Sequence, residues 1–320
     1  MPLIAIIRRV PYLGSLIPNY MKAYTPLTYI IALLFGGIAA NAQIRHQEIS
    51  PAATSPSQVM VHTHHLVYEP AKNNKHQLFI MIPGTNGKAA DFKRFDSSFA
   101  AMGYFVITPD YMNKVVTTVC STSEDSTCFN NFREEIMFGT PVSDKVQVDS
   151  ANSLVQRITT LLNYLAKQQP KQWKQFVING KPRWEHIIVG GHSQGAGHAA
   201  YFGKRFPMAG VLLFSGPQDY LQQFHRPASW QLQVGQTPAS KIYAFLHLQD
   251  PFNYNYQIQD VTAVNQQQLT DTTMVQPNSA VGSHHRIFVT DIDKKDKHGS
   301  TLGTEFTEVW KVMITNAAKR

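Results

Sequence analysis

Short apolar runs alternate with longer amphipathic segments along most of the 320-residue chain. Alternating apolar and polar positions predict a strand over 59–69, and compact apolar runs predict further strands over 78–82, 104–108, 186–190, 210–214, 242–248 and 287–290. Apolar residues spaced three and four apart predict a helix over 148–167, and two more helices are predicted over 194–206 and 303–316. Strands separated by helix-length segments indicate an α/β fold with a mostly parallel central sheet and helices on both faces.

Two stretches, 111–147 and 216–241, fit this alternation poorly. Each follows the carboxyl end of a predicted strand, which is where α/β folds build their ligand crevice. We therefore expect each stretch to be either a cap insertion that shapes a binding site or a plain surface loop.

The first 42 residues have a different pattern from the rest. After a second methionine, Met21, comes an apolar run over 27–40 and then Ala40-Asn41-Ala42, a pattern typical of a secretory signal that is cleaved before Gln43. The run is shorter than the roughly 20 apolar residues that a membrane-spanning helix needs. We therefore expect a secreted or periplasmic protein without stable membrane insertion after cleavage. Residues 1–20 then reflect the choice of start site, and an uncleaved helix tethered to the cell envelope is the alternative.

The composition suits a folded domain, since 43% of the residues are hydrophobic and 16% are charged. The leader contains three basic residues and no acidic one, so its removal leaves 26 basic and 21 acidic residues and a net charge of +5. This excess is spread thinly and forms no dense Lys/Arg run, which argues against nucleic-acid binding. We expect residues 43–320 to form one domain.

The only two cysteines, Cys120 and Cys128, are separated by a polar run. In an exported chain such a pair is typical of a disulfide, because two thiolates without clustered histidines cannot complete a zinc shell. We expect the bond to stabilise a surface segment and to take no part in chemistry.

The strongest chemical signal is Gly191-His192-Ser193-Gln194-Gly195, which lies between a predicted strand and a predicted helix. A G-x-S-x-G motif in this context is typical of a nucleophile elbow, a strained turn from which the serine hydroxyl projects. Glycines stand two residues before and after the serine because larger residues would collide with neighbouring backbone. With this motif, most of residues 59–316 resemble the α/β-hydrolase superfamily, in particular its serine esterases and lipases.

The resemblance implies a nucleophile, an acid and a histidine in that chain order, together with an oxyanion loop after an early strand. The turn after the strand at 78–82 contains Gly84 and Thr85. By the resemblance, the backbone N–H groups of Thr85 and Gln194 would form the oxyanion hole. For the acid we expect Asp250, which follows the strand at 242–248; Asp219 and the more distant Asp260 are the alternatives.

Thirteen histidines compete for the role of base, and His298 lies where the family places it, between the last predicted strand and the closing helix. His284 and His285 precede that strand and should lie at the opposite edge of the sheet. His192 is expected to be a packing or hydrogen-bonding neighbour. The remaining cluster, His62, His64 and His65, cannot converge on a metal ion if the segment is a strand, because only the first two side chains share a face. We expect no metal site.

These features predict a serine hydrolase with the triad Ser193, Asp250 and His298 that transfers acyl groups without a metal or organic cofactor. The expected substrate is a small-molecule or lipid-like carboxylic ester, and a thioesterase or peptidase variant of this chemistry stays open. A non-catalytic binding protein on the same fold is the alternative from another class. The physiological substrate and the oligomeric state are not determined by the sequence.

Overall fold

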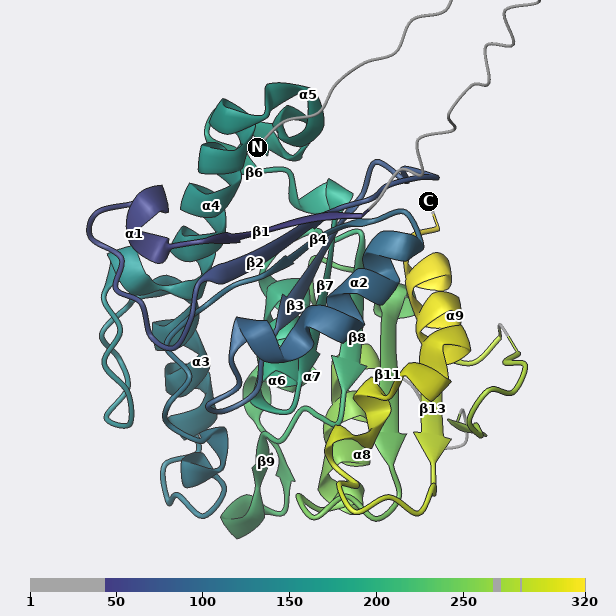
Figure 1. The fold of residues 1–320 in the computed structure, drawn as a ribbon. Coiled ribbons are helices and arrows are strands. Elements are labelled where there is room, and N and C mark those ends of the chain that lie inside the picture. Colours follow the sequence, from purple (N-terminus) through teal and green to yellow (C-terminus); the bar gives the residue numbers. More distant parts are fainter. Residues whose placement is uncertain (1–43, 267–271, 283, 320) are drawn as a thin grey trace, which may run out of the picture. The chain divides into compact units, whose positions relative to one another are not determined.

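The buried strands assemble into one sheet, described here from a computed structural model for residues 44–266, 272–282 and 284–319 (Figure 1). In this part of the chain the sheet has nine strands in the order β1-β2-β4-β3-β7-β8-β11-β13-β12. Strand β2 pairs antiparallel with its neighbours β1 and β4, and all other pairs are parallel. The strands are β1 Arg45–Ile49, β2 His65–Glu69, β3 Leu78–Ile82, β4 Phe105–Thr108, β7 Ile187–His192, β8 Gly210–Phe214, β11 Ile242–His247, β12 Thr272–Met274 and β13 Ile287–Thr290.

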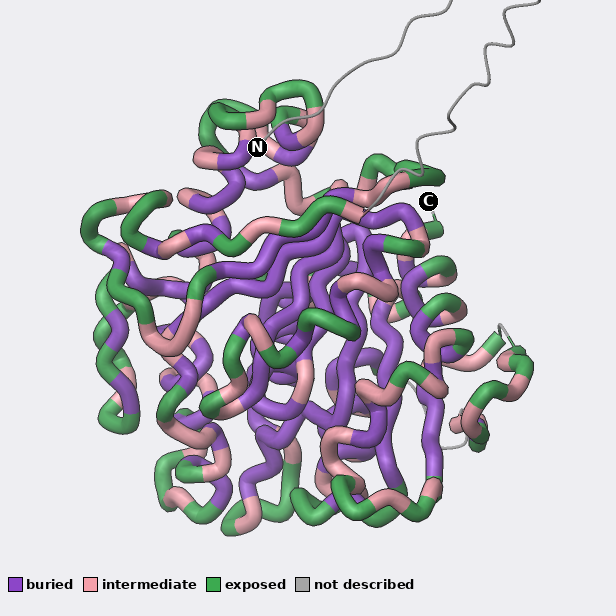
Figure 2. Tube along the Cα trace, in the orientation of Figure 1, coloured by how far each residue is buried: buried purple, intermediate pink, exposed green. Residues whose placement is uncertain are grey.

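Helices cover both faces of this sheet, as the alternation of apolar segments predicted. Helices α2 (Lys93–Ala101) and α9 (Thr307–Ala317) share one apolar cluster with one face of the strands. The opposite cluster takes in α3 (Cys128–Phe138), α4 (Leu154–Gln168), α6 (Gln194–Arg205) and α8 (Tyr254–Asn265). The central strands are therefore buried along their length, whereas exposed residues gather in the connections (Figure 2). The predicted α/β fold with a mostly parallel sheet is confirmed.

The short elements complete the chain. They are the helices α1 (Pro51–Thr54), α5 (Pro170–Trp173) and α7 (Ser229–Leu232) and the two-residue strand pairs β5 Val177–Ile178 with β6 Lys181–Pro182 and β9 Tyr220–Leu221 with β10 Arg226–Pro227. The stretch 216–241 thus contains β9, β10 and α7, and the stretch 111–147 contains α3.

The predicted strand over 59–69 is wrong in its first half, because β2 begins only at His65. The carboxylate of Asp110 accepts the backbone N–H groups of Val61 and His62 at 2.7 and 2.9 Å, so these residues form a carboxylate-bound loop. Consequently, the strand-based argument against a metal site at His62 and His64 does not apply. The His62 ring instead hydrogen-bonds Asn113 at 2.8 Å.

The predicted helix over 148–167 begins six residues later, at Leu154. Ser153 follows a 3-10 turn, Ser150–Asn152, and has extended backbone angles; its side chain accepts the backbone N–H of Gln156, which makes it the N-cap. Helices α2, α3 and α8 were not among the predicted elements.

Cys120 and Cys128 are joined by a disulfide, as predicted. The bond links the end of a short 3-10 turn, Thr117–Cys120, to the first residue of α3. Both cysteines are buried and belong to the larger apolar cluster. The disulfide therefore connects part of the stretch 111–147 to the core.

The predicted leader and its cleavage site before Gln43 lie outside the described residues, so export stays a prediction. Within the described residues, no helix has the length and apolar character required to cross a membrane.

Candidate active site

The turn between β7 and α6 holds Ser193 in an unusual backbone conformation, with φ 59° and ψ −124°. A positive φ is uncommon for a residue with a side chain and marks a strained turn. A Cβ at Gly191 would run into the carbonyl of Gly195, and a Cβ at Gly195 would run into the carbonyl of Ile82. The two glycines are thus required by close backbone approach, as the motif predicted.

The predicted site residues follow four parallel strands that end at the same edge of the sheet. Thr85 follows β3, Ser193 follows β7, Asp250 follows β11 and His298 follows β13. Parallel strands place their carboxyl ends together, so residues separated by more than 200 positions become neighbours.

Asp250 and His298 form a hydrogen-bonded pair, with 2.7 Å between Oδ2 of the aspartate and Nδ1 of the imidazole. The second oxygen of Asp250 accepts the backbone N–H of Phe252 at 2.8 Å. Burial opposes ionisation of Asp250, but the hydrogen bond and charge of His298, with the backbone bond from Phe252, hold its pKa below the ordinary value. Asp250 is therefore favoured in its ionised form, and this carboxylate is suited to orient the imidazole of His298.

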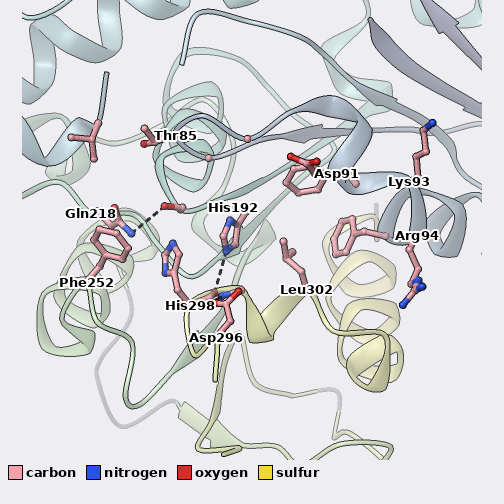
Figure 3. A pocket seen from close by; sticks show the side chains of 17 residues that line it. Thr85, Asp91, Lys93, Arg94, His192, Gln218, Phe252, Asp296, His298 and Leu302 are labelled. Atoms are coloured by element: carbon pink, nitrogen blue, oxygen red, sulfur yellow. Dashed lines mark hydrogen bonds between the residues drawn. The ribbon is translucent and has the colours of Figure 1, made fainter. Parts of the chain in front are cut away.

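The other nitrogen of His298, Nε2, is buried and has no hydrogen-bond partner among the described residues. His298 and Ser193 line the same pocket, which has a volume of about 930 Å³ (Figure 3). The Ser193 hydroxyl accepts a long hydrogen bond of 3.3 Å from Nε2 of Gln218. Ser193 and a histidine with an unpaired ring nitrogen thus line one cavity.

Thr85 and Gln194 are held together through their side chains. The Thr85 hydroxyl donates to Oε1 of Gln194 at 2.6 Å, and the backbone N–H of Thr117 donates to the same oxygen at 3.1 Å. Gly84 lets this loop approach the serine, since a Cβ there would lie 2.9 Å from the Cβ of Ser193. Gln194 is the first residue of helix α6, so its backbone N–H has no acceptor within the helix. This N–H can therefore donate a hydrogen bond to a ligand oxygen.

The alternative acid, Asp219, lies elsewhere in the core. Its two oxygens accept from Nε and Nη2 of Arg133 at 2.9 and 2.6 Å, and its backbone N–H donates to Asp260 at 2.8 Å. Burial and the neighbouring Asp219 raise the pKa of Asp260 well above the ordinary carboxyl value. The structure thus brings Asp250, and neither alternative, into contact with His298.

The other histidines make different contacts. His192 hydrogen-bonds the carbonyl of His298 at 3.1 Å, and burial together with the adjacent His298 lowers its pKa to about 4. His65 accepts the backbone N–H of Asp110 through Nδ1 at 2.9 Å. His284 and His285 precede β13 and do not line the pocket. Over residues 44–266, 272–282 and 284–319, no three histidine, cysteine or acidic side chains are placed to hold a metal ion.

The pocket is lined by both apolar and charged residues. Phe92, Phe95 and Leu302 supply apolar surface, and the charged residues in the lining are Asp91, Lys93, Arg94 and Asp296, of which the first three lie on one side (Figure 3). Lys93 is paired with Glu48 at 2.6 Å. This arrangement suits a ligand with an apolar portion next to the serine.

Three contributors to the site were not predicted from the sequence. Gln218 and Phe252 line the pocket, and Arg133 donates through Nη1 to the carbonyl of Gln194 at 2.8 Å. In the sequence, Arg133 and Gln218 lie in the stretches 111–147 and 216–241, which are the candidate cap segments. No sequence pattern indicates Phe252.

No protein-family model matches the chain, and no curated protein sequence matches it. Among solved structures, it is similar to esterase B from Lactobacillus rhamnosis, with 12% identity, a TM-score of 0.45 and 87% of each chain covered. It is also similar to an S-formylglutathione hydrolase from Agrobacterium tumefaciens, with 13% identity, a TM-score of 0.45 and 79% of this chain and 89% of that chain covered. An esterase domain from Rhodothermus marinus shares 10% identity at a TM-score of 0.42, with 86% and 97% covered.

The fold itself is defined by the chain's own geometry. A mostly parallel sheet is covered by helices on both faces, and a strained serine turn joins β7 to α6. With these features, the chain has the α/β-hydrolase fold.

Proposed function

We propose that the protein is a serine hydrolase that cleaves carboxylic esters by acyl transfer, with Ser193 as nucleophile, His298 as base and Asp250 as the acid that orients it. The observation that carries this proposal is the 2.7 Å bond between Asp250 and Nδ1 of His298, which leaves Nε2 without a partner in a residue that lines the same pocket as Ser193. An aspartate in this position fixes the tautomer and stabilises the imidazolium that forms.

In the first half-reaction, Nε2 of His298 takes the proton of the Ser193 hydroxyl while Oγ bonds to the ester carbonyl carbon. The carbonyl oxygen becomes negative and receives hydrogen bonds from the backbone N–H groups of Thr85 and Gln194. Preorganised donors of this kind typically lower a barrier by about 3 to 4 kcal/mol each. The bond to the alcohol then breaks, and His298 returns the proton to the leaving oxygen.

In the second half-reaction, water attacks the acyl-enzyme. His298 accepts a proton from the water while the water oxygen bonds to the acyl carbon. The tetrahedral intermediate then expels the Ser193 oxygen, which regains a proton from the imidazolium of His298. The products are a carboxylic acid and a free enzyme. The proposed chemistry uses only side chains and backbone groups of this chain.

A fluorophosphonate probe tests the nucleophile directly, because an activated hydroxyl attacks phosphorus as it attacks a carbonyl carbon. We expect one covalent adduct, located at Ser193 by peptide mass spectrometry, together with hydrolysis of p-nitrophenyl butyrate. The Ser193→Ala variant should lose both signals, whereas Ser57→Ala, at an exposed serine that does not line the pocket, should keep the adduct. Undiminished labelling of Ser193→Ala would reject the assignment, and lack of any labelling or turnover would favour the binding-protein alternative.

A further inference from the structure

A second pocket adjoins the pocket that holds Ser193. Gln218 and Phe252 line both, and the neighbouring pocket has a volume of about 400 Å³. We call it the polar pocket, and its other walls include Thr118, Ser121, Thr122, Tyr220, Gln222 and Tyr256. The two pockets therefore share part of one wall.

The chemistry of the polar pocket is neutral and rich in hydrogen-bonding groups. No charged residue lines it within the described part of the chain. The hydroxyls of Thr118, Ser121 and Thr122 make no hydrogen bond to another described side chain or carbonyl. Hydroxyl and amide groups both donate and accept, so they match ligand hydroxyls and give no advantage to an ion.

Tyr256, which is partly exposed and packs on the buried Tyr220, adds aromatic surface to this wall. The rings of Tyr220 and Tyr256 stack with 4.2 Å between centroids and 6° between planes. Pockets that combine such a surface with placed polar groups bind small molecules that have an apolar face and several polar substituents. A sugar or polyol fits this description, because its carbon skeleton carries hydroxyls along its edge.

The position of the polar pocket relates it to one end of the ester. The ring of Phe252 lies 4.6 Å from the ring of His298, and Gln218 and Phe252 lie on one side of His298 while Leu302 and Arg94 lie on the other (Figure 3). In the proposed mechanism, His298 delivers a proton to the leaving oxygen. The group attached to that oxygen is therefore beside His298, whose neighbour Phe252 also lines the polar pocket.

The walls of the polar pocket are fixed in place by covalent and hydrogen bonds. The backbone N–H of Gln222 donates to the carbonyl of Ser121 at 2.8 Å, which joins the stretch 216–241 to the stretch 111–147. The disulfide anchors Cys120, the neighbour of Ser121, to α3. A preorganised pocket loses less entropy on binding than a mobile loop would.

We propose that the polar pocket binds the alcohol part of the substrate and that this alcohol is neutral and polyhydroxylated, of the glycerol or hexose type. The apolar wall of Phe92, Phe95 and Leu302 then takes the acyl chain. This inference rests on the proposed ester hydrolysis, and it assigns the two long insertions a role in selecting the alcohol.

The test compares kcat/KM within matched pairs of butyrate esters. One pair is glycerol monobutyrate against n-propyl butyrate, the other is methyl glucoside 6-butyrate against cyclohexylmethyl butyrate, and choline butyrate is the charged alcohol. We expect at least one polyhydroxylated ester to exceed its alkyl partner by 10-fold or more, and choline butyrate to show no such gain. The pair with the larger ratio identifies glycerol or hexose as the alcohol type. Equal rates within both pairs would overturn the inference.

Two neighbouring glutamines provide a matched pair of variants. Gln222 lines the polar pocket, whereas Gln223 is exposed outside it. Gln222→Leu should lower the polyol-to-alkyl ratio of kcat/KM about five-fold, the scale of one lost hydrogen bond, with the larger loss on the polyol ester. Gln223→Leu should leave this ratio unchanged. An equal loss for both esters in Gln222→Leu would count against a specific contact.

The outcomes separate this inference from the proposed function. If the wild-type protein hydrolyses no ester and takes up no fluorophosphonate, the proposed function fails and the polar pocket loses its assigned role with it. If hydrolysis depends on Ser193 but shows no preference for polyhydroxylated alcohols, only the present inference is overturned.

Discussion

At the scale of single residues, Asp250 and Asp219 are both buried aspartates, but their partners differ. Asp250 bonds His298 at the pocket, whereas Asp219 forms a two-point ion pair with Arg133 beneath it. Replacing each aspartate by asparagine therefore separates a catalytic effect from a structural one.

We expect Asp250→Asn to lower kcat by roughly 10⁴-fold, because an amide favours the wrong imidazole tautomer and cannot stabilise the imidazolium. Asp219→Asn should instead weaken folding, by about 3 to 5 kcal/mol if Arg133 stays charged and unpaired. Its kcat per folded molecule should stay within a few-fold of wild type. Ester turnover measured beside urea unfolding distinguishes the two effects. A comparable loss of kcat in folded Asp219→Asn would move the acid to that position.

At the scale of elements, Arg133 connects helix α3 to the elbow helix α6. Its guanidinium is fully buried, bonds the carbonyl of Gln194, and fills the space where a Cβ of Gly197 would lie. The stretch 111–147, which contains α3, is thus attached to the helix that follows Ser193.

We expect Arg133→Met to destabilise the protein by about 3 to 5 kcal/mol, because Asp219 would be left as a buried charge without its partner. The double variant with Asp219→Leu should recover part of this loss, since it removes both charges. Arg205→Met is the control: Arg205 pairs with Glu134 at 2.6 Å but is 43% exposed, so its loss should change stability by at most about 1 kcal/mol. Denaturant unfolding of wild type, Arg133→Met, Asp219→Leu, the double variant and the control measures the coupling, and additive effects of the two single core variants would contradict it.

The elements differ in how strongly their own residues indicate them. Strands such as β3 and β8 are short and wholly apolar, so their bounds were predicted to the residue. Helix α8 mixes polar and apolar residues without a clear stripe and was missed. Gln218 and Phe252 join the pocket only through the path of their loops, which depends on long-range contacts such as the one between Gln222 and Ser121. No local pattern carries that information.

At the scale of the whole molecule, the core contains a buried carboxyl group, that of Asp96, whose surroundings favour the protonated, neutral form. Asp96 on α2 is buried in the apolar cluster shared with α9, and only its hydrogen bond from Thr108 at 2.7 Å satisfies it within the described residues. Burial raises the pKa of this carboxyl well above the ordinary value of 3.8, although the bond from Thr108 acts in the opposite direction.

This raised pKa makes stability depend on pH. Above pH 3.8, Asp96 loses its proton in the unfolded chain but keeps it in the folded protein. The contribution of Asp96 to the free energy of unfolding therefore falls as pH rises, by at most about 1.4 kcal/mol per pH unit, until the folded carboxyl also ionises. We expect Asp96→Asn, which is neutral at every pH, to gain stability relative to wild type between pH 5 and pH 8 in urea unfolding. A difference between the two proteins that is constant over this range would show that Asp96 is charged when folded.

The position of the site residues along the chain affects how activity arises during folding. Ser193 follows β7 near the centre of the sheet, whereas His298 follows β13, and β8 and β11 lie between these strands. A chain that has paired β4, β3 and β7 already contains the serine turn, but its base is still unplaced. Ester turnover on refolding therefore reports closure of the carboxyl-terminal half of the sheet, long after local helices can form.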